Sequence, residues 1–188
     1  MSDAYYKTEA SVKEYIKLAK GFNGAELIEK LKQYLALKSS VLEIGSGPGT
    51  DWEILNKLYR VTGSDNSEEF LNHLTLQYNE TFLNLDATTL DTTMKFDGIY
   101  SNKVMHHLTD DELAQSIKKQ HSVLNTNGII CHSFWKGEGS EIFKGLFINY
   151  HEKYSIEKLF EDNFKILYLG LYNEFDEDDS ILLIGKKK

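Results

Sequence analysis

The stretch VLEIGSGPGTD, residues 41–51, joins a short apolar run to a loop that has glycine at every second position: Gly45, Gly47 and Gly49. Glycine in such a loop either gives the backbone a positive φ or leaves room where a ligand approaches. An ordinary turn after a strand and a loop that cradles a nucleotide both fit, because a glycine-rich loop alone is weak evidence. The surrounding sequence has to decide between them.

The composition is that of a globular protein of one domain. The chain has 188 residues, of which 41% are hydrophobic and 27% are charged. Its net charge of -8 and its pI of about 5.3 disfavour nucleic acid and anionic membranes as partners. The single cysteine, Cys131, excludes an internal disulfide, and Cys/His metal spacing is absent, so we predict no metal site.

The beginning of the chain does not resemble a targeting segment. Its first residues, MSD, lack the basic-then-apolar order of a secretory signal. No apolar run approaches the roughly 18 residues that a membrane span needs. We therefore expect a cytoplasmic protein with no membrane segment.

Short apolar runs alternate with helix-like stretches over most of the chain. The runs begin near residues 41, 61, 81, 96 and 128, and helical patterns cover residues 52–59, 68–78 and 110–124 between them. Two further helices are predicted earlier, around residues 12–19 and over residues 25–37. Thr109 and Glu112 form a capping-box pattern at the start of the 110–124 helix. Residues 87–95 are weakly periodic and predict no long helix. Such alternation is typical of a parallel, doubly wound sheet with right-handed crossovers.

The pattern changes near the C-terminus. Residues 164–175 and 180–187 are strand-like runs joined only by the acidic turn DEDD, so these two strands have to pair antiparallel. The predicted fold class is a single-domain α/β doubly wound, mostly parallel seven-stranded sheet with an antiparallel last strand. We divide it into an N-terminal helical cover (1–38), a cofactor-binding core (39–135), and a substrate-side segment with the C-terminal strand pair (136–188).

Acidic side chains end the strands that surround the glycine loop. Asp65 ends the second run, where a carboxylate suits the ribose 2′ and 3′ hydroxyls and repels a 2′-phosphate, so NADP is disfavoured. The dinucleotide fingerprint fails because Thr50 stands where its third glycine belongs, and no Walker lysine follows the loop. A nucleoside with a cationic, non-phosphate appendage fits better: Glu43 would face the cation, and Asp86 would accept from an adenine amino group. Alternatively, both aspartates cap the segments that follow them.

Four motifs in order at strand ends resemble those of one family. The segments VLEIGSGPGTD, VTGSDNSEEFL, LNLDA and FDGIYSNKVMHHL are similar to the successive motifs of the class I S-adenosylmethionine-dependent methyltransferases. The match covers residues 41–134, and the final strand pair resembles the reversed seventh strand of that family. The resemblance implies a Rossmann-like methyltransferase fold, S-adenosylmethionine as the cofactor, and methyl transfer as the reaction.

The resemblance also implies a role for individual residues. Around the methionine moiety and ribose it places Glu43, Gly45, Ser46, Gly47 and Gly49. It assigns the ribose hydroxyls to Asp65 and the adenine to Asn66, Asp86 and Ala87. Near the methyl group it places Ser101 and Asn102.

Transfer from a sulfonium requires mainly alignment and the exclusion of water. A general base is needed only where the acceptor is protonated at working pH, and His106 and His107 are the best-placed candidates. Alternatively, one histidine packs against the sheet and the other is solvated. His132, which we place beyond the fifth strand, has no carboxylate partner at a spacing that supports a metal site.

A cover over the cofactor is expected from aromatic residues. Two groups of aromatic residues could exclude water and contact a substrate, or could belong to the core. One is Tyr5, Tyr6 and Tyr15 in the leading segment, by which we mean residues 1–24, and the other lies in residues 134–139 (FWKGEG).

The methyl acceptor is narrowed mainly by elimination. The sole proline, Pro48, excludes the N-P-P-Y motif of amino-group methylases, and no cysteine nucleophile follows the fourth strand. No long insertion is present to grip a macromolecule. We therefore predict a small-molecule acceptor; the alternative is a non-catalytic S-adenosylmethionine-binding module that acts through a protein partner.

Overall fold

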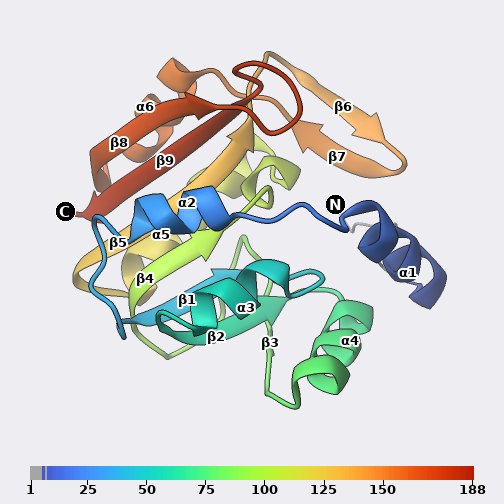
Figure 1. The fold of residues 1–188 in the computed structure, drawn as a ribbon. Coiled ribbons are helices and arrows are strands. Elements are labelled where there is room, and N and C mark those ends of the chain that lie inside the picture. Colours follow the sequence, from blue (N-terminus) through green and yellow to red (C-terminus); the bar gives the residue numbers. More distant parts are fainter. Residues whose placement is uncertain (1–5, 7) are drawn as a thin grey trace.

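The computed structural model describes residue 6 and residues 8–188 (Figure 1). Within them, seven strands form one sheet in the order β3-β2-β1-β4-β5-β9-β8. Their bounds are β1 (Ser40–Ile44), β2 (Arg60–Asp65), β3 (Leu83–Asn84), β4 (Phe96–Ser101), β5 (Leu124–Trp135), β8 (Phe164–Tyr172) and β9 (Ser180–Lys187). The first five strands are parallel, and β9 runs antiparallel to both of its neighbours. The predicted fold class is confirmed.

Helices cover both faces of the sheet. The helices are α1 (Glu9–Leu18), α2 (Ala25–Leu31), α3 (Thr50–Asn56), α4 (Glu68–Tyr78), α5 (Asp110–Val123) and α6 (Lys153–Phe160), with a 3₁₀ helix η2 (Met105–His107). Because side chains alternate along a strand, Val41 packs with α2 and α3 on one face, whereas Leu42 packs with α5 and α6 on the other. Burial on both faces explains why the central strands read as continuous apolar runs.

Several helix ends differ from the sequence prediction. The helix predicted over 25–37 ends at Leu31, although Leu35 still packs into the core through a following turn. The helix predicted from residue 52 starts at Thr50, because Gly49 (φ 84°) turns the chain directly into it. The capping box is confirmed: Thr109 Oγ1 accepts from the N–H of Glu112, whose side chain accepts from the N–H of Thr109.

Three features of the C-terminal third were missed or misplaced. Residues 140–149 form a β-hairpin, β6 (Ser140–Phe143) and β7 (Leu146–Asn149), and α6 follows it. His132 lies inside β5, not beyond it, because the fifth strand extends to Trp135. The hairpin was missed in the sequence analysis because its two short strands mix polar and apolar residues and show no clear hydrophobic period.

Two segments lie over the carboxyl ends of the parallel strands. Figure 1 shows α1 and the β6–β7 hairpin on the side of the sheet toward which β1, β4 and β5 point. The turn of the hairpin meets α1 through an ion pair between Lys144 Nζ and Glu14 Oε1 at 3.3 Å.

The helices of the described chain are all too short or too polar to cross a membrane.

Candidate active site

A large cavity opens at the carboxyl ends of β1, β2 and β4. Its volume is about 860 Å³, within the range of small-molecule sites. The glycine-rich loop, the end of β2, η2, the hairpin and the leading segment all contribute to its wall. Of the predicted cofactor residues, those that line it are Glu43, Gly45, Ser46, Gly47, Asp65, Asn66, Asp86, Ala87 and Asn102.

The glycine-rich loop combines a packed position with an open one. At Gly49 a Cβ would lie 2.5 Å from a ring carbon of Tyr78, and φ is 84°, so both space and conformation require glycine. At Gly47, φ is 48° and a Cβ would have nothing within 4 Å of it, because the residue faces the cavity. Gly49 therefore serves packing, whereas Gly47 keeps the backbone accessible to a ligand.

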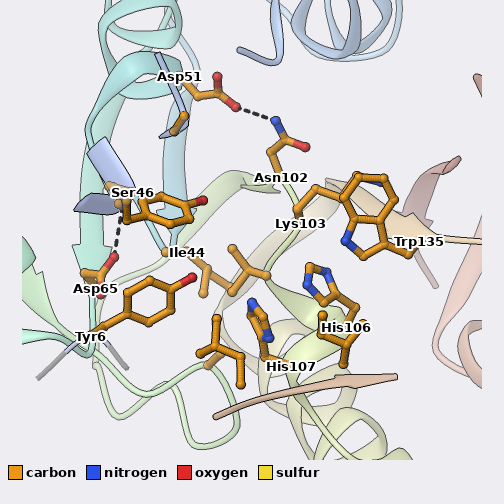
Figure 2. A pocket seen from close by; sticks show the side chains of 18 of the residues that line it. Tyr6, Ile44, Ser46, Asp51, Asp65, Asn102, Lys103, His106, His107 and Trp135 are labelled. Atoms are coloured by element: carbon orange, nitrogen blue, oxygen red, sulfur yellow. Dashed lines mark hydrogen bonds between the residues drawn. The ribbon is translucent and has the colours of Figure 1, made fainter. Parts of the chain in front are cut away.

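Asp65 ties this loop to the end of β2. Its Oδ2 accepts from the N–H of Gly47 in the loop at 2.9 Å (Figure 2). Its Oδ1 accepts from the N–H of Ser67 at 2.9 Å. The residue is 7% exposed and lines the cavity. Each carboxylate oxygen can accept more than one hydrogen bond. Asp65 can therefore hold the loop and still accept from ligand hydroxyls, which joins the two roles that the sequence left as alternatives.

Glu43 is buried at the base of the loop. It is 2% exposed, and its Oε2 accepts from Ser46 Oγ at 2.5 Å. Burial, and to a smaller degree the charges of Asp51 and Asp65, raise the pKa of Glu43 to about 8. Its carboxyl group therefore holds a proton at neutral pH, and a positively charged group beside it would favour ionisation.

Asp51 is a cavity residue to which the sequence analysis gave no role. Its Oδ1 accepts from the N–H of Gly24 at 2.6 Å, and its Oδ2 accepts from Tyr100 Oη at 2.7 Å and Asn102 Nδ2 at 3.0 Å. Ser133 Oγ fixes the other end of the Asn102 amide at 2.6 Å. The only signal in the sequence was an acidic side chain in the first turn after the glycine loop. This carboxylate joins the leading segment, α3 and β4 at one point, and Figure 2 shows its contact with Asn102.

Ser101 departs from the predicted arrangement. It is fully buried, and its Oγ lies 2.7 Å from His132 Nδ1, whose Nε2 lies 2.8 Å from Gln120 Oε1. Strand alternation turns the Ser101 side chain toward α5, whereas Asn102 faces the cavity. Asp86 lines the cavity while its Oδ1 accepts from the N–H groups of Thr88 and Thr89, so it also caps the turn that follows.

The two histidines of η2 both line the cavity but differ in surroundings. His106 is 3% exposed, and its Nδ1 has no hydrogen-bond partner in the described part of the chain. Burial, followed by the nearby His107, Lys103 and His151, holds the pKa of His106 well below its usual value. His107 Nδ1 lies 2.8 Å from the carbonyl oxygen of Phe147 and so contacts the hairpin. His106 is thus a neutral imidazole at physiological pH.

The wall beyond η2 is aromatic and was only partly anticipated. Trp135 lines the cavity, as expected for the FWKGEG segment, whereas Phe134 belongs to the core. Lys103 Nζ lies 3.3 Å from the centroid of the Trp135 ring and donates to Phe134 O and Ser180 Oγ. Burial lowers the pKa of Lys103 to about 7. Lys103 becomes part of the cavity wall because β4, β5 and β9 meet at this point. No local sequence pattern shows that these strands meet.

The leading segment contributes aromatic side chains as well. Tyr6 and Tyr15 line the cavity and contact each other, with ring centroids 5.3 Å apart, and both contact Phe70 of α4. Tyr5, predicted with them, lies outside the described residues. No group of His, Cys, Asp or Glu in residues 6 and 8–188 is arranged to hold a metal ion.

Comparisons with known proteins agree with this geometry. Residues 41–128 match the family described as "Methyltransferase domain". This segment, which holds the four strand-end motifs, is a methyltransferase domain of the class I S-adenosylmethionine-dependent superfamily. The family predicted from four strand-end motifs is therefore confirmed. No curated protein matches the chain by sequence.

Solved structures share the fold of this methyltransferase at low identity. The 1,6-didemethyltoxoflavin-N1-methyltransferase of Burkholderia thailandensis superposes with a TM-score of 0.79 at 18% identity, over 95% of this chain and 84% of that chain. The N-methyltransferase NodS of Bradyrhizobium japonicum gives 0.73 at 14% identity, over 99% of each chain. A methyltransferase of Clostridium acetobutylicum gives 0.76 at 15% identity, over 94% and 97%. At such identities the likeness shows the fold.

Proposed function

We propose that this protein transfers a methyl group from S-adenosylmethionine to a small-molecule acceptor. The observation that carries the proposal is one continuous cavity that joins the carboxylate of Asp65 to the wall formed by His106 and Trp135. Among the structural neighbours, the Burkholderia enzyme and NodS are N-methyltransferases, and each was solved with S-adenosylhomocysteine. The neighbour from Burkholderia was also solved with a small molecule, 1,6-didemethyltoxoflavin.

The residues present fit this cofactor. In the proposed arrangement, Asp65 accepts from the ribose hydroxyls, and Asn66, Asp86 and Ala87 contact the adenine. Backbone groups of residues 45–48, the acidic Glu43 and the Asn102 amide surround the methionine portion, whereas Gly49 packs behind the loop. Glu43 suits a cation-bearing chain because ionising its buried carboxyl group becomes favourable once a positive charge lies beside it.

The chain's own groups supply alignment and a dry environment. The sulfonium of the cofactor supplies an already activated methyl group. Tyr6 and Tyr15 exclude water from one side of the cavity and Trp135 from the other. His106, neutral because of burial, accepts a hydrogen bond from the nucleophilic group of the acceptor and orients its lone pair. His107 contacts the hairpin and so positions the part of the cavity wall that the hairpin forms. Cytoplasmic location and the division into three segments stay predictions.

Thermal shift with four ligands tests the cofactor. S-adenosylmethionine and S-adenosylhomocysteine are expected to raise the melting temperature, and NAD and NADP are expected to leave it unchanged, because only a ligand that binds the folded state stabilises it. A shift with NAD alone would overturn the proposal.

Turnover separates an enzyme from a non-catalytic binding module. Incubation with methyl-labelled S-adenosylmethionine and a metabolite extract is expected to give a labelled small molecule. Cofactor binding without turnover, together with a stoichiometric protein partner, would favour the binding module instead.

A further inference from the structure

Exposed apolar side chains gather at the mouth of the cavity. Across the described residues, nine large hydrophobic side chains are exposed. Four of these also line the cavity: Leu18 (59% exposed), Phe22 (45%), Phe143 (55%) and Phe175 (62%). We call these four residues the apolar rim. Exposed apolar groups grouped around a polar site mark a surface that a ligand covers.

The rim continues into the interior without a break. The rings of Phe22 and Phe175 meet edge to face with centroids 5.0 Å apart. Phe175 in turn stacks on Trp135, at 5.6 Å and 19° between planes. Trp135 lies beside His106, with ring centroids 6.3 Å apart. An aromatic surface therefore runs from solvent to the histidine that we place at the acceptor.

Charge along the same cavity is unfavourable for anions. Besides the protonated Glu43, eight acidic residues of the described chain line it: Asp51, Asp65, Asp86, Glu112, Glu141, Glu174, Asp176 and Asp179. Three lysines line it, and two of these already have partners. Lys103 Nζ donates to Phe134 O and Ser180 Oγ, and Lys144 pairs with Glu14. A carboxylate or phosphate entering here would meet mostly like charge.

We propose that the apolar rim binds the body of the methyl acceptor, and that this acceptor is a ring-bearing or alkyl compound without negative charge. The inference rests on the proposed function, since it assigns the rim to the acceptor of that reaction. Covering the exposed rings removes apolar surface from water, and aromatic rings give a flat body a defined orientation. The acidic lining is compatible with neutral and cationic acceptor molecules and repels anionic ones.

Matched probes test charge and size separately. Protein saturated with S-adenosylhomocysteine is titrated calorimetrically with 1-naphthylmethylamine, 1-naphthylmethanol and 1-naphthoate, which share one ring system and differ in charge. The amine and the alcohol are expected to bind, and the naphthoate to bind at least about 10-fold more weakly. Benzylamine, which has one aromatic ring instead of two fused rings and so buries less apolar surface, is expected to bind about 10-fold more weakly than 1-naphthylmethylamine.

Variants test the rim itself. Phe175→Ser and Phe143→Ser are each expected to weaken binding of 1-naphthylmethylamine about 5- to 30-fold. Leu76→Ser is the matched control, because Leu76 lies on α4, is 86% exposed and does not line the cavity. Its probe affinity is expected to stay at the wild-type value. S-adenosylhomocysteine affinity is measured on every variant, so that a loss confined to the naphthyl probes reports the rim.

Three outcomes would overturn the inference while leaving the proposed function intact. The first is equal affinity of the wild-type protein for 1-naphthoate and 1-naphthylmethylamine. The second is unchanged affinity for 1-naphthylmethylamine in both rim variants. The third is that no naphthyl probe binds, while the protein self-associates or binds vesicles and Phe175→Ser abolishes that association. Failure of the wild-type protein to bind S-adenosylhomocysteine would instead overturn the proposed function, and this inference with it.

Discussion

The two ends of the cavity are built in different ways. The cofactor end, where we propose that S-adenosylmethionine binds, comes from strand ends close to one another in the sheet. Buried and part-buried hydrogen bonds hold it: Asp65 to the glycine loop, and Asp51 to Tyr100 and Asn102. The acceptor end, where we propose that the methyl acceptor binds, comes from the leading segment, the hairpin and the loop after β8. Exposed rings and one exposed ion pair, Lys144 with Glu14, join its parts.

This difference separates what is general in the protein from what is specific. A carboxylate held by buried donors keeps its geometry whichever acceptor is bound, because breaking one such contact leaves a buried polar group unsatisfied. Rings at a solvent-exposed mouth can be exchanged at small cost to folding. Substitutions at the cofactor end should therefore change cofactor affinity and stability together, whereas those at the acceptor end should change acceptor binding alone.

The largest effect is expected at Asp65. Asp65→Ala removes the acceptor for the N–H groups of Gly47 and Ser67, and in the proposed complex two hydrogen bonds to ribose. We expect S-adenosylhomocysteine affinity to fall about 30- to 1000-fold, or about 2–4 kcal/mol, in calorimetric titration. We also expect the free energy of unfolding to fall by about 1–2 kcal/mol.

Asp97→Ala is the matched control for this change. The Asp97 carboxylate accepts from the N–H of Ser40 and from Asn125, at the end of the sheet away from the cavity. Its loss is expected to lower stability and leave cofactor affinity unchanged. Wild-type affinity in Asp65→Ala would remove Asp65 from the cofactor site.

Glu43 should make stability depend on pH. Its carboxyl group keeps its proton in the folded chain up to about pH 8 but loses it in the unfolded chain above about pH 4.5. The folded state holds the extra proton between these values, so the wild-type free energy of unfolding falls as the pH rises across this window. Glu43→Gln, which cannot ionise, is expected to be about 2–4 kcal/mol more stable than wild type at pH 9.

Urea unfolding at pH 5 and pH 9 measures this difference. The two proteins are expected to have nearly equal stability at pH 5. A stability difference that is the same at both pH values would contradict the assignment of the extra proton to Glu43.

Gly24→Ala tests how the leading segment is attached to the cofactor end. A Cβ at this position would lie 2.0 Å from Tyr100 Oη and 2.6 Å from Asp51 Oδ2, so the contact of Gly24 with Asp51 has to open. We expect a loss of about 1–3 kcal/mol in stability by thermal unfolding. Adding Tyr100→Phe removes the nearer atom and is expected to recover part of the loss; no recovery would show that Tyr100 is not the obstacle.

The smallest effect is expected for the ion pair of the cover. Lys144 and Glu14 have side chains 47% and 56% exposed, so Lys144→Ala is expected to cost less than about 1 kcal/mol and to leave S-adenosylhomocysteine affinity within about twofold. Lys13→Ala, which removes an exposed pair within α1, is the control. A tenfold loss of affinity in Lys144→Ala alone would mean that the hairpin helps to hold the cofactor.

The sequence by itself determined the fold class, the superfamily and most of the residues that line the cavity at the end where we propose the cofactor. Each of these signals is local: an apolar run, its terminal Asp65 or Asp86, and the glycines after Val41 stand within a few positions of one another. Parallel strands bring such ends together without further information, because their carboxyl ends share one edge of the sheet.

Only the tertiary structure decided the acceptor end and the orientation of individual side chains. Lys103 meets Trp135, and Phe22 meets Phe175, across segments far apart in the chain, and no period or motif couples such positions. Ser101 and Asn102 are neighbours in sequence, yet strand alternation sends one toward α5 and the other into the cavity. Contacts of this kind depend on how elements pack against each other, and packing is a property of the whole fold, not of any local stretch.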